Sequence, residues 1–169
     1  IDDTVSLTYN NAFSTNPLLD LTVELAYSDT TADKSNFSLG MACAPGRNSV
    51  LCDSSYGYST TPLRIENTAD VSSGAWDSFL IAGLQITGQD RTAYSSVGDL
   101  AFHPEGTSDT TGIYVQGEFV YNDVLTLIPG VRADFSEINP GTGAALAGGK
   151  AVSDTAISPK LAAMYQVTD

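Results

Sequence analysis

Apolar and polar residues alternate along much of the chain, and this alternation limits the possible folds more than any other feature. In residues 19–28, Leu, Leu, Val, Leu and Tyr take every second position, and mostly polar residues lie between them. Because successive side chains of a β-strand point to opposite faces, a period of two gives a strand with one apolar and one polar face. The same pattern is clear in residues 80–89, 113–121, 125–135 and 157–167, and weaker in residues 5–9 and 63–72. The sequence therefore predicts seven strands and an all-β fold.

The connections between these predicted strands alternate strictly between short and long. In chain order they are residues 10–17, 29–62, 73–77, 90–112, 122–124 and 138–152. A water-soluble sandwich has no reason to place every long loop at one end, whereas a transmembrane barrel has short periplasmic turns and long external loops. Several predicted strands also reach the ~9–11 residues that a tilted membrane strand needs, against ~5–6 in soluble sheets. We therefore expect an antiparallel transmembrane β-barrel.

Seven strands alone would leave two open edges in lipid, which the membrane does not permit. We therefore expect the chain to be a segment of about seven strands of a larger barrel. The sequence has no starting Met, no basic n-region and no apolar h-region, so we expect it to be a mature product or an excerpt.

Composition excludes other classes of protein. The chain has 7 Lys and Arg against 20 Asp and Glu, a net charge of −13, which argues against a nucleic-acid-binding surface. Since 42% of the residues are apolar and only 16% are charged, the chain is not a disordered acidic tail. We find no catalytic constellation, phosphate loop or metal-ligand cluster, so we expect neither an enzyme nor a metal site.

Aromatic residues fall near both ends of the predicted strands. The short-turn ends carry Phe13, Trp76, Phe79, Tyr121 and Tyr165, and the long-loop ends carry Tyr27 and Phe135. Aromatic belts at the two membrane interfaces would have this distribution. Aromatic residues also flank many turns in soluble proteins, so this alternative stays open.

The connection at residues 122–124 permits a prediction of register. If Tyr121 and Leu125 both face lipid, they pair directly, and the link has three residues rather than two. We expect Asn122 or Asp123 to take the left-handed conformation in this link. Pro129 and Pro159 conflict with the strand pattern because proline lacks the N–H that the ladder needs. A bulge, or a carbonyl group that is unpaired locally, would accommodate each of them.

The two cysteines, Cys43 and Cys52, flank a Pro-Gly turn in a polar stretch. This arrangement predicts a small disulfide-closed loop, and hence an oxidising location such as the periplasm or the cell surface. Two unrelated thiols are the alternative.

Four segments of the chain resemble the barrel of TonB-dependent outer-membrane receptors, and most of all the haem and haemoglobin receptor branch. They are NPLLDLTVELAYSDT (16–30), HPEG (103–106), GIYVQGEFVYNDVLTLIPGVRADF (112–135) and SPKLAAMYQVTD (158–169). The resemblance implies a 22-stranded barrel in the bacterial outer membrane, with a plug domain in its lumen. Residues 1–169 would then be part of one barrel domain, and the plug and the remaining strands would lie outside this chain.

The resemblance also implies a function and partners. The receptor would take up an iron-bearing ligand, with haem as a transported ligand and no covalently bound cofactor. Its partners would be outer-membrane lipid, TonB acting through the plug domain, and haemoglobin or another haem carrier. The FRAP-type motif of the family, with its haem-ligating histidine, does not occur in this chain, so no family ligand residue can be transferred.

Candidate site residues fall into two groups. The first is expected in external loops that contact ligand, and consists of His103, Tyr56 and Tyr58, for which solvated loop residues are the alternative. The second is expected to face the lumen, where it would contact the plug or a hydrated passage, or simply solvate the barrel wall. Its members are Asp20, Glu24, Glu118, Arg132, Asp134 and Lys160.

Two alternatives to haem uptake remain at this stage. One is a siderophore receptor of the same superfamily, and the other is a secreted β-rich surface adhesion module. The environment of four apolar residues distinguishes an adhesion module from a receptor of either kind. In an adhesion module they would pack against a second sheet, and in a receptor they would face lipid. These residues are Leu21, Leu25, Leu127 and Leu161.

Overall fold

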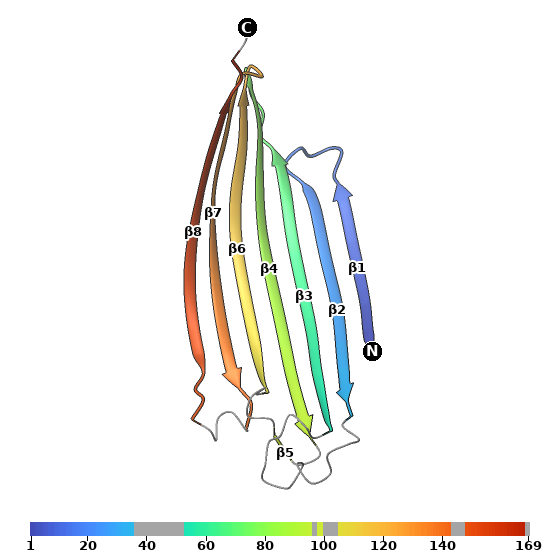
Figure 1. Ribbon diagram of the computed structural model, residues 1–169. Coiled ribbons are helices and arrows are strands. Elements are labelled where there is room, and N and C mark those ends of the chain that lie inside the picture. The colour runs from blue at the N-terminus through green and yellow to red at the C-terminus, as the bar shows by residue number, and fades with distance from the viewer. Residues whose placement is uncertain (36–52, 96–97, 100–104, 143–147, 168–169) are drawn as a thin grey trace.

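The computed structural model describes residues 1–35, 53–95, 98–99, 105–142 and 148–167, and its strands form one antiparallel sheet (Figure 1). The seven long strands are neighbours in chain order, and the two-residue strand β5 (Gly98–Asp99) pairs with the end of β4. The long strands are β1 (Asp2–Ala12), β2 (Asp20–Lys34), β3 (Ser54–Asp70), β4 (Trp76–Ser95), β6 (Gly106–Tyr121), β7 (Leu125–Pro140) and β8 (Val152–Tyr165). The prediction of seven strands in an all-β fold is therefore confirmed.

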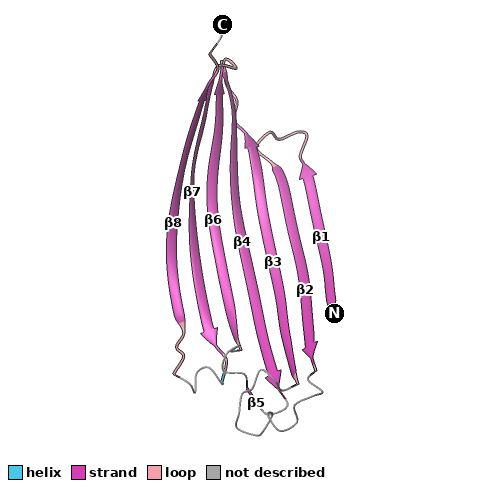
Figure 2. Ribbon diagram, viewed as in Figure 1, coloured by secondary structure: helices cyan, strands magenta, loops and turns pink. Residues whose placement is uncertain are grey.

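Short and long connections lie at opposite ends of the sheet, as predicted (Figure 2). However, the predicted bounds of the long connections are wrong because the strands continue further. β3 begins at Ser54 rather than at residue 63, and β4 continues to Ser95. The added stretches are rich in Ser, Thr and Asp and lack apolar alternation, so the sequence pattern ends although the backbone ladder continues.

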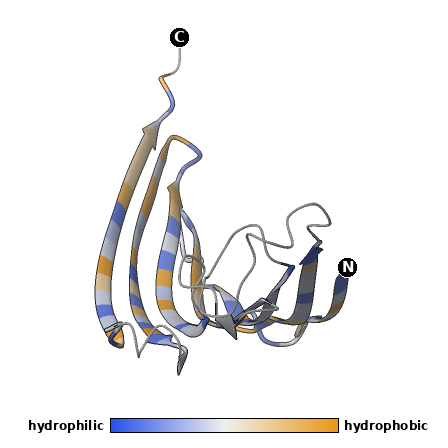
Figure 3. Cartoon of the chain, turned by 60° about the horizontal axis from the view of Figure 1, so that its bottom comes forward, coloured by the Kyte–Doolittle hydropathy of each residue, from blue (hydrophilic) through white to orange (hydrophobic). Residues whose placement is uncertain are grey.

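The strand register separates apolar from polar side chains. One row of paired residues on one face consists of Val23, Ile65, Leu84, Ile113, Ala133 and Ile157. The adjacent row on the other face consists of Glu24, Arg64, Gln85, Gly112, Asp134 and Ala156. We call these the apolar face and the polar face, and Figure 3 shows the resulting alternation of hydrophobic and hydrophilic bands along the strands.

The apolar face is not covered by a second layer in the described part of the chain. Leu25 is 43% exposed, Leu161 is 78% exposed, and Leu21 and Leu127 are partly exposed. Ala93 is the one hydrophobic residue that is buried among the residues described. The sheet therefore has no core of its own, contrary to what a sandwich-type adhesion module requires. The described residues include no helix with the length and apolarity needed to cross a membrane.

The apolar surface covers only the part of the sheet nearest the short turns. On β4 the apolar face runs from Leu80 to Ile86 and then continues through Gly88, Asp90 and Thr92. The other strands show the same change, so the half of the sheet near the long connections is polar on both faces.

Among the aromatic residues, Trp76 and Tyr121 contact each other on the apolar face, with ring centroids 4.9 Å apart. Phe79 lies on the polar face opposite Glu118, so its predicted place in an interfacial belt is wrong.

The tight connection between β6 and β7 has the predicted form. Tyr121 pairs with Leu125, and the Val124 N–H donates a hydrogen bond to the Tyr121 carbonyl oxygen at 3.0 Å. Asn122 and Asp123 both adopt the left-handed conformation, with φ of 48° and 58°.

The two prolines are accommodated without an added residue. Gln116 pairs with Gly130 and Phe119 with Leu127, so the register is the same on both sides of Pro129 although the pairs between them are missing. A local gap in the ladder, the second predicted alternative, therefore replaces a bulge. At β8, the Gln166 N–H donates to the Val124 carbonyl at 2.8 Å, and the alternation of hydrogen-bonding directions then points the Pro159 nitrogen away from β7.

Candidate functional site: a hydrogen-bonded polar wall

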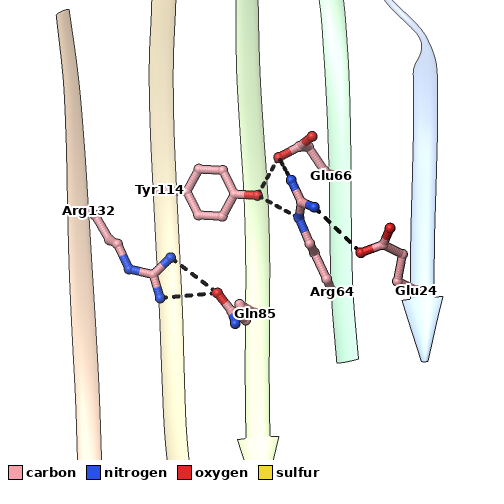
Figure 4. A network of polar contacts seen from close by, with 6 residues as sticks. All are labelled: Glu24, Arg64, Glu66, Gln85, Tyr114 and Arg132. Atoms are coloured by element: carbon pink, nitrogen blue, oxygen red, sulfur yellow. Dashed lines mark hydrogen bonds and ion pairs between the residues drawn. The ribbon is translucent and has the colours of Figure 1, made fainter. Parts of the chain in front are cut away.

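The polar face carries a network of side chains from β2, β3 and β6 at its centre (Figure 4). Arg64 donates to Glu66 at 2.7 Å and to Glu24 at 3.5 Å. The Tyr114 hydroxyl donates to Glu66 Oε2 at 2.5 Å and accepts from Arg64 Nε at 3.5 Å. Glu66 therefore accepts hydrogen bonds from a guanidinium and from a phenol, and its side chain is the least exposed of the charged groups here, at 21%.

Arg132 on β7 extends this network toward β4. Its guanidinium forms an ion pair with Asp134 at 2.7 Å and donates to Gln85 Oε1 at 3.4 Å. The same guanidinium lies 5.6 Å from the centre of the Tyr114 ring, within the range of a cation–π interaction. Two arginines thus meet three carboxylates, so most of the charge of this network is neutralised within it. We call the network and the polar face around it the polar wall.

Two glycines make room for these long side chains. A Cβ atom on Gly83 would collide with the ring of Tyr114, and a Cβ atom on Gly112 would collide with the Arg132 guanidinium and with Asp134. Since neither glycine has a side chain, Tyr114 and Arg132 lie flat across the neighbouring strand. The surface of the wall is therefore shallow, and its charged side chains are partly exposed.

The structure places all six residues predicted to face the lumen on the polar face. Glu24, Arg132 and Asp134 belong to the network, and Lys160 donates to Gln116 Oε1 at 2.9 Å. Asp20 lies at the start of β2, where its backbone N–H donates to Asn67 Oδ1 at 3.2 Å. Glu118 lies opposite Phe79, apart from the network.

The ligand-contact candidates are placed differently from the prediction. Tyr56 and Tyr58 are not loop residues, because both lie in β3 on the polar face near the long-connection end. Tyr58 packs against Arg91, whose guanidinium carbon lies 5.5 Å from the ring centre. The sequence pattern did not predict this part of β3, because the residues around these tyrosines are mostly polar and show no apolar alternation. His103 and the predicted Cys43–Cys52 disulfide lie outside the described residues.

Sequence reasoning missed Arg64, Glu66, Gln85 and Tyr114. Arg64 and Glu66 do alternate with Leu63 and Ile65, but only in the weaker of the predicted strands. Their meeting with Tyr114 depends on the pairing of three strands, which the sequence pattern does not specify. Within the described ranges, no group of three or more His, Cys, Asp or Glu side chains is placed to hold a metal ion.

Residues 2–169 match the family model described as "TonB dependent receptor-like, beta-barrel". The chain belongs to the TonB-dependent receptor β-barrel family. This family consists of transport receptors, and the observed sheet corresponds to a segment of its barrel.

Solved structures support the fold of this receptor segment. The hemophore receptor HasR of Serratia marcescens, solved as a double mutant with its hemophore HasA and heme, superimposes with a TM-score of 0.68 at 17% identity. The copper transporter OprC superimposes with a TM-score of 0.65 at 14% identity. The chain is covered to 98% and 99%, but spans only 26% and 28% of these two proteins. No curated protein is similar enough in sequence to be matched to the chain.

Proposed function

We propose that this chain is part of the wall of a bacterial outer-membrane receptor that takes up an iron-bearing ligand, with haem or haemoglobin-derived haem as the first candidate. The separation of faces carries this proposal. An uncovered apolar face suits hydrocarbon, and a partly exposed face of paired charges suits a water-filled lumen. Short turns at one end and long connections at the other match periplasmic and external sides.

The rest of the receptor follows from this assignment. The edges of β1 and β8 would pair with further strands of a closed barrel, because unpaired backbone groups are too costly in lipid. A plug domain would occupy the lumen, and TonB would act on that plug from the periplasm. Haemoglobin or another haem carrier would deliver ligand at the external side.

Haem is favoured because the sequence most resembles the haem branch and because a hemophore receptor has a similar fold. A second candidate is a metal complex other than haem, such as a ferric siderophore. The nearly equal structural similarity to a copper transporter favours keeping this candidate.

Growth on defined iron sources tests the function. A strain that lacks the receptor gene, with and without a plasmid copy, is grown with haem or with a ferric siderophore as the sole iron source. We expect loss of growth on haem only, restored by the plasmid and dependent on TonB. Unchanged growth on haem would remove the haem assignment, and loss on the siderophore alone would establish the second candidate.

Binding of haem to cells tests the predicted contact residues. We propose that His103, Tyr56 and Tyr58 contact ligand, and we expect His103→Ala or Tyr56→Ala to weaken binding about tenfold, as loss of a ligating or stacking group would. Tyr94→Ala is the matched control. Tyr94 follows Ala93, the β4 partner of Tyr56, and therefore lies on the opposite face of the sheet, where it is 64% exposed. Equal effects of Tyr56→Ala and Tyr94→Ala would contradict the assignment of Tyr56.

A further inference from the structure

Three long side chains on the polar face cross a glycine to reach a strand two positions away. Tyr114 on β6 crosses Gly83 on β4 and bonds to Glu66 on β3. Arg132 on β7 crosses Gly112 on β6 and bonds to Gln85 on β4.

The third is Lys160 on β8, which reaches past Gly130 on β7 to Gln116 on β6. All three lean in the same direction across the sheet.

The crossing at Gly130 differs from the other two. At Gly83 and Gly112 a tyrosine or an arginine fills the space, whereas a Cβ atom on Gly130 would make only ordinary contacts of 3.4–3.5 Å with Val115 and Gln116. A hollow of about 320 Å³ lies here, and Gln116, Gly130, Arg132 and Lys160 are among its lining residues. Of the three crossings, only the one at Gly130 therefore has spare room above the glycine.

The charge of this hollow is also unusual in a chain with a net charge of −13. Arg132 is neutralised by Asp134, but Lys160 is held by a neutral amide. Among the residues described, no carboxylate lies within ion-pair distance of Lys160. An ammonium held in this way keeps N–H groups and a positive charge for an incoming anion.

We propose that the hollow at Gly130 lies on the route of the ligand through the lumen, and that Lys160 holds an anionic group of the ligand, such as a carboxylate, as it passes. This inference rests on the proposed function and adds to it a ligand class and a contact residue. In the network beside the hollow, the other two cations, Arg64 and Arg132, are already paired with carboxylates. In the competing interpretation, the plug domain occupies the hollow permanently. The experiments below separate these two interpretations.

Filling the hollow tests the route. In the full-length receptor, Gly130→Trp would project into the hollow, whereas Val131→Trp on the same strand points to the apolar face, where Val131 is 43% exposed. We expect Gly130→Trp to lower the initial rate of haem uptake by about tenfold while haem binding at the cell surface stays within about twofold. Val131→Trp should change neither quantity. Unchanged uptake by a folded Gly130→Trp receptor would overturn the route.

Changing Lys160 tests the contact. We expect Lys160→Gln to slow haem uptake by about tenfold, since a charge-assisted hydrogen bond is replaced by a neutral one, and Lys160→Arg to restore most of the rate. A purely structural role through Gln116 would instead make Gln116→Leu, which removes the acceptor but keeps the Lys160 charge, slow uptake as much as Lys160→Gln does. Equal rates for wild type and Lys160→Gln would refute the contact, and so would an equal loss of rate in Gln116→Leu.

Thiol labelling separates the inference from the proposed function. Gly130→Cys and Val131→Cys are introduced with Cys43→Ser and Cys52→Ser, and cells are treated with a hydrophilic maleimide. We expect labelling at Gly130→Cys, slowed by excess haem, and none at the lipid-facing control. Absence of labelling at Gly130→Cys would show that the plug permanently covers the hollow, and would overturn the proposed route. If the wild-type receptor takes up no haem, the proposed ligand fails, yet labelling still decides whether the hollow is open.

Discussion

At the scale of single residues, the polar wall depends on positions that have no side chain. Gly83 and Gly112 each lie under a long polar side chain from the next strand, so their role is to leave space rather than to bend the backbone. Lys160 reaches past Gly130 on the same face but leaves the space above this glycine unfilled. Substitutions at these three glycines should therefore have different effects.

We expect Gly83→Val to destabilise the receptor by about 1–3 kcal/mol, because the added atoms displace Tyr114 and break its bond to Glu66. Gly130→Ala is the matched control and should be close to neutral, since its Cβ atom has room. Thermal unfolding of the purified receptor in detergent, followed by circular dichroism, measures both. Equal melting temperatures for the two variants would contradict this account of Gly83.

The two carboxylates beside Arg64 should also differ. Glu66 lies 2.7 Å from Arg64 and accepts a second bond from Tyr114, whereas Glu24 lies 3.5 Å away and its side chain is 46% exposed. We expect Glu66→Gln to lower the free energy of unfolding by about 1 kcal/mol and Glu24→Gln by less than about 0.5 kcal/mol, because exposed pairs are screened by solvent. Urea titration in detergent gives both values. A larger loss for Glu24→Gln would reverse the ranking of the two ion pairs.

The sequence allowed part of this wall to be predicted. Glu24, Arg132 and Lys160 could be assigned to the polar face because each lies out of phase with a strong apolar alternation. The contacts between these side chains could not be predicted. Arg132, for example, reaches Gln85 because Gly112 has no side chain in its path. Such contacts depend on register across several strands rather than on local pattern.

At the scale of elements, the β6–β7 hairpin is the connection that the sequence defines best. The requirement that Tyr121 and Leu125 share a face fixed the length of the link, and Asn and Asp tolerate the left-handed conformation that it needs. The outer halves of β3 and β4 could not be predicted, because their Ser- and Thr-rich stretches carry no apolar period.

We expect Asp123→Gly to keep or slightly raise stability, because glycine adopts the φ of 58° without steric cost. Asp123→Val should lower stability by about 1–2 kcal/mol, since a β-branched residue is strained in the left-handed region. Refolding yield from urea into detergent micelles, compared at matched protein concentration, measures the difference. Indistinguishable yields for the two variants would argue against strain at this position.

At the scale of the whole molecule, the proposed placement in a membrane gives opposite expectations for adjacent residues. Leu161 lies on the apolar face and is 78% exposed, and Ala162 lies on the polar face opposite Ile128. We expect Leu161→Arg to cost about 2–4 kcal/mol near the bilayer midplane and to reduce folded receptor in the outer membrane. Ala162→Arg should be tolerated. Heat-modifiable mobility of the membrane fraction on a gel reports folding, and equal amounts for both variants would contradict the assignment of faces.

The length of the strands has a consequence for how cargo reaches the receptor. β4 has 20 residues, which at about 3.3 Å each and a tilt of about 40° span about 50 Å along the membrane normal. The hydrocarbon-facing band of an outer-membrane barrel is only about 25 Å tall. On the proposed placement, the strand ends therefore form a hydrophilic collar that rises above the lipid headgroups. Under the proposed function, a carrier protein would dock on this collar and release its cargo without any membrane affinity of its own.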